Sequence, residues 1–142
     1  MNPQRRTERA IPDSNANAER SLRPRPGDDI AERLLGLAVA VVKLLPALAD
    51  EPGAKAIVKQ LERCGPAGGS NYEEARGAES PGDFVHKVRI ALKEVRETRY
   101  WLKLALRAEL TAEPTRLGPL IQEAEELIAI LTASANTARR RM

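Results

Sequence analysis

A row of cationic residues in the second half of the chain offers the clearest binding chemistry. Its members, one of them aromatic, recur at steps of three and four residues: Arg89, Lys93, Arg96, Tyr100, Lys103 and Arg107. On an α-helix this spacing places five cations and one ring on one face. Such cations bind phosphates with salt-sensitive affinity, and the ring can stack on an unpaired base. The row predicts a nucleic-acid-binding face. The alternative is a solvated face paired with acids of the last helix or a neighbouring subunit.

A second face of the same segment carries a different set of side chains. Ile90, Glu94, Glu97 and Trp101 point neither along the cations nor toward the main apolar stripe. An exposed tryptophan beside an isoleucine usually marks an interface. Ile90 and Trp101 are therefore candidate contacts between subunits. The alternative is that Trp101 covers a loop of its own subunit.

Residues suited to catalysis or metal binding are sparse. A di-iron bundle needs a Glu-x-x-His motif from each of two helices, but His86 is the only histidine. His86 is also the only conventional base for a nucleophile, and the single cysteine, Cys64, is expected to be a small buried residue. The glycines of residues 65–69 lack the Lys-Ser/Thr pair of a phosphate-binding loop. The sequence predicts a protein that is not an enzyme and has no cofactor and no metal.

The composition favours one helical domain. Of 142 residues, 42% are apolar but only 3% are aromatic, so the core must use Leu, Ala, Val and Ile, which suits helix packing better than strands. The net charge of +3 comes from the ends, with six arginines against three acids in residues 1–27 and three consecutive arginines before the last residue. We expect a disordered basic tail over 1–27, a domain over 28–138 and a basic tail over 139–142.

The first helix is expected from residue 28 or 29 to about residue 49. Asp29 and Glu32 have the spacing of a capping box. Apolar residues cover most of its circumference, so it should be buried on more than one side, inside the bundle or against another subunit. Its apolar run of 16 residues, Leu34 to Ala49, contains a lysine and a proline and is shorter than the roughly 20 residues that span a bilayer. We expect a cytoplasmic protein with no membrane partner.

Three further stretches are expected to be helical. Local rules predict two short helices within residues 54–76, because the three glycines and one proline of residues 65–69 ordinarily end a helix. Ser80 is the expected N-cap of the next helix, which should run to about residue 108. Its core stripe is Phe84, Val88, Ala91, Leu92, Val95, Leu102 and Leu106. The last helix should fade near Thr137. Together these elements predict an all-α, antiparallel up-down four-helix bundle.

Several motifs in register resemble one known family. They are Asp29-Ile30-Ala31-Glu32-Arg33-Leu34-Leu35, Asn71-Tyr72-Glu73-Glu74-Ala75, Ala78-Glu79-Ser80, Asp83-Phe84, His86-Lys87, Leu92-Lys93-Glu94, Arg96-Glu97-Thr98-Arg99-Tyr100-Trp101-Leu102, Glu123, Leu127, Ile130-Leu131-Thr132 and Thr137-Ala138. The family is the four helix bundle proteins, also called 23S ribosomal RNA intervening-sequence proteins. The resemblance covers about residues 29–138 and excludes the arginine-rich N-terminal tail.

The resemblance implies four antiparallel helices, homopentamers in some members, and no established catalytic activity. Family genes include reading frames inside insertions in bacterial 23S ribosomal RNA genes, and a relative, the accessory protein of diversity-generating retroelements, binds nucleic acid and a reverse transcriptase. The resemblance also implies one long helix over residues 54–76. Pro66 stands where the family usually has a small polar residue, so we expect this helix to bend near Gly65. Asn71 and Glu74 match the characteristic polar pair of that helix, which implies a structural role for them.

Two functions follow from these observations. The first is a non-catalytic, homo-oligomeric protein associated with RNA or another nucleic acid, with five subunits expected. The second is a protein-binding scaffold or accessory subunit, for example of a reverse transcriptase, without direct contact to nucleic acid.

Overall fold

The computed structural model describes residue 18 and residues 23–142. In this part of the chain the main elements are α2 (Asp28–Ala49), α3 (Lys55–Arg76), α4 (Pro81–Arg107), the 3-10 turn η1 (Pro114–Arg116) and α5 (Leu117–Arg140), with no strand. The predicted all-α class with four helices is confirmed. The prediction of a disordered tail over residues 1–27 lies mostly outside the described residues.

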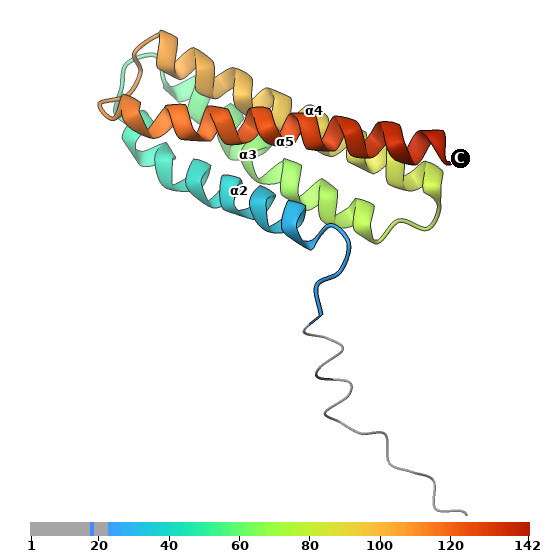
Figure 1. The fold of residues 1–142 in the computed structure, drawn as a ribbon. Coiled ribbons are helices and arrows are strands. Elements are labelled where there is room, and N and C mark those ends of the chain that lie inside the picture. The colour runs from blue at the N-terminus through green and yellow to red at the C-terminus, as the bar shows by residue number, and fades with distance from the viewer. Residues whose placement is uncertain (1–17, 19–22) are drawn as a thin grey trace, which may run out of the picture.

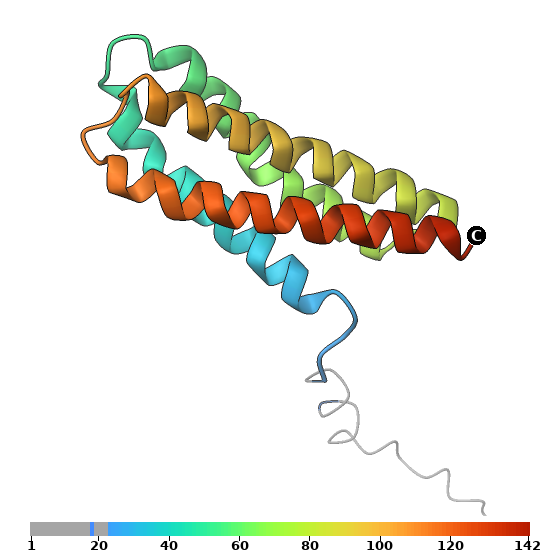
Figure 2. The same ribbon diagram turned by 45° about the horizontal axis from the view of Figure 1, so that its top comes forward.

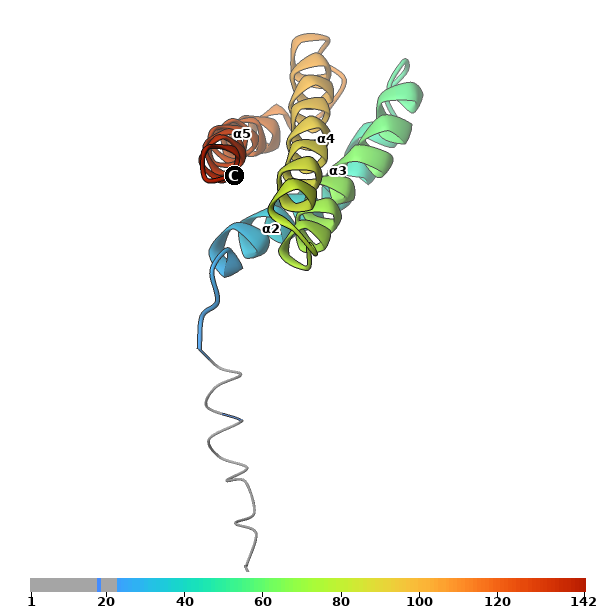
Figure 3. The same ribbon diagram turned by 90° about the vertical axis from the view of Figure 1, so that its right-hand side faces the viewer.

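The four helices lie side by side and the chain turns back at alternating ends of the molecule, as Figures 1 and 2 show. Each helix contacts the next one in the sequence, and α5 also contacts α2. Seen from one end in Figure 3, α4 lies between α3 and α5. These contacts are consistent with the predicted up-down bundle. Among the described residues, no helix is both long and apolar enough to cross a membrane.

The start of α2 differs from the predicted capping box. Gly27 is the N-cap, with φ 84° and no side-chain cap, so Asp29 does not cap the helix. Asp28 instead accepts hydrogen bonds from the Arg25 backbone N–H and the Arg76 guanidinium, and these bonds hold the pKa of Asp28 below its usual value. A Cβ on Gly27 would lie 2.5 Å from the Tyr72 hydroxyl, so both the left-handed backbone and the space require glycine.

Helix α3 is one uninterrupted helix, contrary to the two short helices of the local rules and as the family resemblance implies. Its glycines serve helix packing. A Cβ on Gly65 would lie 2.8 Å from Cγ1 of Val41 in α2, and a Cβ on Gly68 would lie 2.7 Å from Cγ2 of Val95 in α4. We call these two positions the glycine seam. Their missing side chains let α2 and α4 approach the backbone of α3 closely.

Helix α4 begins as predicted. The Ser80 hydroxyl accepts a hydrogen bond of 3.1 Å from the Asp83 backbone N–H. Just beyond the end of the helix, Glu109 lies in the left-handed region at φ 55°. The N–H of Leu110 then donates a hydrogen bond to the carbonyl of Ala105 at 2.9 Å. The buried stripe is Val85, Val88, Ala91, Val95, Thr98, Leu102 and Ala105. The expected core members Phe84, Leu92 and Leu106 are only partly buried, because they lie along the edges of this stripe.

Helix α5 runs to Arg140, past the predicted end at Thr137 and into the expected basic tail. Arginines stabilise the last turn of a helix, because they offset the partial negative charge of its carbonyl end. In the first half of α5, ion pairs connect the helix to α2. Arg33 of α2 pairs with Glu123 and, at 2.7 Å, with Glu126 of α5.

Candidate functional site

The predicted cationic row lies along the outer side of α4. We call it the basic face, comprising Arg89, Lys93, Arg96, Tyr100, Lys103 and Arg107. All are exposed except Lys103, which is half-buried. Lys103 lies 3.9 Å from Glu125 of α5 and is the only one of these cations with an ion pair inside residues 23–142. Pairing with α5 therefore accounts for one cation of the five.

Two acids on the neighbouring side of α4 are held by another helix. Arg63 of α3 pairs with Glu94, at 3.1 Å, and with Glu97. The hydrogen bond to Glu97 is the main reason why the pKa of Arg63 is raised. Because Arg63 already satisfies these carboxylates, they do not pair with Arg89, Lys93 or Arg96. The basic face keeps a net positive charge.

A groove joins the basic face to the flank of α3. It encloses about 520 Å³ and is lined by Gln60, Arg63, Arg89, Leu92, Lys93, Arg96, Glu97, Tyr100 and Trp101. Tyr100 is 59% exposed, and its ring centroid lies 4.9 Å from that of Trp101 with the two planes at 82°. The structure thus brings three unpaired cations and two aromatic rings to one groove. Gln60 and Arg63 come from α3, and no sequence pattern had linked them to the row.

The two candidate subunit contacts are less exposed than the sequence suggested. Ile90 and Trp101 are both partly buried, and Trp101 packs against the core of its own chain. The reason is that this side of α4 turns toward α3, where Arg63 covers the neighbouring acids. Their role in subunit contacts stays a prediction.

Exposed apolar surface is found on α2 instead. Leu35, Val39 and Val42 are 56%, 45% and 50% exposed, and their spacing of four and three residues places them on one stripe. We call these three residues the apolar face. The sequence indicated this face, because apolar residues cover most of the circumference of the helix. The single chain buries only one side of it.

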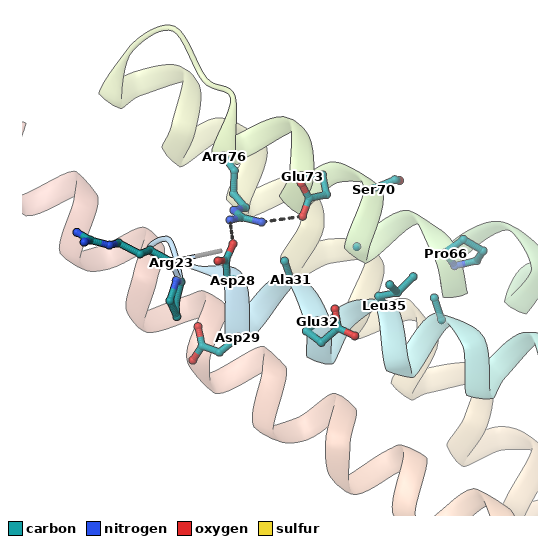
Figure 4. A pocket seen from close by; sticks show the side chains of 13 residues that line it. Arg23, Asp28, Asp29, Ala31, Glu32, Leu35, Pro66, Ser70, Glu73 and Arg76 are labelled. Carbon is teal, nitrogen blue, oxygen red and sulfur yellow. Dashed lines mark hydrogen bonds and ion pairs between the residues drawn. The ribbon is translucent and has the colours of Figure 1, made fainter. Parts of the chain in front are cut away.

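A second groove, between α2 and α3, adjoins the apolar face through Leu35 (Figure 4). It encloses about 830 Å³. Its lining includes the apolar residues Ala31, Leu35, Ala38 and Pro66 and the polar residues Asp28, Asp29, Glu32, Glu73 and Arg76. Arg76 crosses between the helices and pairs with Asp28 and, at 3.0 Å, with Glu73.

The remaining polar candidates do not assemble into a reactive site. Cys64 is buried, and burial raises the pKa of its thiol, which disfavours the nucleophilic thiolate. His86 is exposed. The described residues contain no group of three or more metal-ligating side chains. The Asn71 amide donates to the Ala67 carbonyl at 2.8 Å within α3, whereas Glu74 is exposed.

Comparisons with known proteins agree on a family. Residues 29–133 match the model of the 23S rRNA-intervening sequence proteins. The chain is also similar to a crystal structure of a protein of unknown function from the S23 ribosomal protein family of Bacteroides thetaiotaomicron VPI-5482, with 33% sequence identity and a TM-score of 0.68. The similarity covers 75% of this chain and 97% of that one. No curated protein matches the sequence.

Proposed function

The chain belongs to the 23S rRNA-intervening sequence protein family, and from that premise we propose that it is a non-catalytic assembly protein that binds RNA. The observation that carries the proposal is the row of exposed cations on α4, three of which remain unpaired around Tyr100 in the groove. We further propose that the four helices form an up-down antiparallel bundle and that the protein is cytoplasmic. The cytoplasm is a reducing compartment, which is compatible with the single cysteine.

Salt dependence of RNA binding tests this proposal. If the basic face contacts phosphates, each contact should add about −0.7 to −0.9 to the slope of log affinity against log salt. Lys93→Gln with Arg96→Gln should therefore make the slope shallower by roughly one to two units. Glutamine is a comparable helix former, so helix content should stay unchanged.

The matched control removes the same charge elsewhere. Lys55 and Lys59 are exposed on α3 and do not line the groove, so changing both to Gln should leave the slope nearly unaltered. Both comparisons are to be repeated in a chain that ends at Ala138, because Arg139–Arg141 would bind phosphate as well. Absence of RNA binding at low salt, or equal slopes for both double variants, would refute binding by the basic face.

A protein-binding role is the second candidate, and the apolar face of α2 favours it. Three large apolar side chains about half exposed on one stripe are typical of a surface that another chain covers. We propose that this partner is first of all a second copy, in an assembly with five subunits as the expected number. Light scattering at micromolar concentration tests the assembly, and the monomer mass of 15.6 kDa would contradict it.

A further inference from the structure

We infer that the groove between α3 and α4 binds an unpaired nucleobase, so that the RNA recognised there is single-stranded. This inference rests on the proposed RNA binding and adds a ligand class and further contacting residues, Gln60 and Trp101. Charge alone would bind duplex and single strand alike, since both carry phosphates. The rings and the amide in the groove distinguish the two.

The aromatic pair forms two walls of the groove. Tyr100 and Trp101 are in contact with their planes at 82°, so a flat group that stacks on one ring presents its edge to the other. Tyr100, at 59% exposed, offers most of its ring to a ligand. Bases in a duplex are already stacked on both sides and leave no free face. Stacking on such rings is thus available to unpaired bases.

The surrounding polar groups fit a nucleotide. Arg89, Lys93 and Arg96 lie on the N-terminal side of Tyr100, and the helix rises about 16 Å over this stretch. That length matches roughly five stacked nucleotides at about 3.4 Å each. On the opposite flank, the Gln60 side-chain oxygen accepts only a long bond of 3.5 Å from Arg63. Its amide therefore keeps donor and acceptor capacity for a base edge.

The chain supplies its own reporter for this contact. Trp101 is the only tryptophan, so tryptophan fluorescence reports on this groove alone. The full chain would be titrated with a short single-stranded RNA, with the same strand annealed to its complement, and with inorganic polyphosphate of equal charge. We expect the single strand to quench Trp101 and to bind more tightly than the duplex. Polyphosphate should bind through the cations without comparable quenching.

Variants of Tyr100 separate stacking from charge. Tyr100→Ala should weaken single-strand binding roughly five- to hundred-fold while leaving the salt slope unchanged, because no cation is lost. Tyr100→Phe keeps the ring and should bind almost as tightly as the unaltered chain.

The possible outcomes distinguish the two proposals. Equal binding of single strand and duplex, with unquenched Trp101 and no effect of Tyr100→Ala, would overturn the base-binding inference and leave RNA binding by charge intact. Quenching by polyphosphate as strong as that by RNA would also overturn it, since no base would then be needed. Failure of every RNA form to bind would refute the proposed function itself.

Discussion

Adding one methyl group at Gly68 should not stabilise the protein, although alanine is the better helix former. In a helix interior Gly→Ala ordinarily adds about 1 kcal/mol to stability. Here the new Cβ would lie 2.7 Å from Cγ2 of Val95, which is 2% exposed. A β-branched side chain in a helix has one preferred rotamer, so Val95 cannot turn away. Overpacking of this kind costs about 1 to 3 kcal/mol, which leaves Gly68→Ala between neutral and about 2 kcal/mol less stable.

Gly36 provides the matched control. It lies inside α2 with no atom within 4 Å of a Cβ built there, so Gly36→Ala gains helix propensity without overpacking. The difference between the two variants therefore isolates the cost at the glycine seam. We expect Gly68→Ala to be about 1 to 3 kcal/mol less stable than Gly36→Ala, or roughly 4 to 12 °C lower in melting temperature.

Urea and thermal unfolding, followed by circular dichroism at one protein concentration, measure this difference. A double-mutant cycle identifies its cause: in a Val95→Ala background the clash is removed, so Gly68→Ala should cost less than it does alone. The reasoning is refuted if Gly68→Ala raises stability as much as Gly36→Ala does, or if the two sites 68 and 95 prove additive.

Three further expectations concern other parts of the chain. Glu109→Gly should stabilise the protein by about 1 kcal/mol in urea unfolding, because Glu109 occupies a left-handed conformation at φ 55°. A destabilised variant would contradict this. Asp28 has a lowered pKa, so its charged form contributes stability that is present above pH 3.8 and lost as pH falls through the folded-state pKa. The Asp28→Asn variant should therefore be less stable than the unaltered chain at neutral pH, and its free energy of unfolding should fall less on acidification. Parallel curves of unfolding free energy against pH for the two proteins would disprove this role of Asp28. Leu35→Lys with Val42→Lys should shift the light-scattering mass toward 15.6 kDa with helix content retained. An unchanged mass would place self-association elsewhere.

Signals that lie within a few residues of one another predicted most of the helix boundaries. Ser80 caps α4 as its type and position indicate, because the cap needs only the N–H three residues on. The start of α2 at residue 28 was predicted correctly, but its predicted capping box was wrong for the opposite reason. Its arrangement depends on Tyr72 and Arg76, which are more than 40 residues away in the sequence. Likewise, the glycines of the glycine seam predict a helix break from the sequence alone. In the structure, Val41 and Val95 occupy the space that side chains at these positions would fill.

The candidate site divides in the same way. Helical spacing alone places the cations of the basic face on one side of α4, and the structure confirms that placement. The participation of Gln60 and Arg63 could not be predicted, since it depends on how α3 packs beside α4. The partial burial of Trp101 has the same origin. The exposure of Leu35 could be predicted only in part. The sequence indicates an excess of apolar residues in the first helix, but it does not indicate which side of that helix stays exposed.

The apolar and basic faces lie on different helices, and this separation bears on avidity. Helix α2 packs against α3 and α5, whereas the basic face lies along the outer side of α4. Copies that join through α2 would leave every basic face free. A single RNA strand could then bridge neighbouring copies, with the second contact made at the millimolar effective concentration typical of short flexible tethers. Affinity would then rise in steps with strand length, without any new contact inside a single groove.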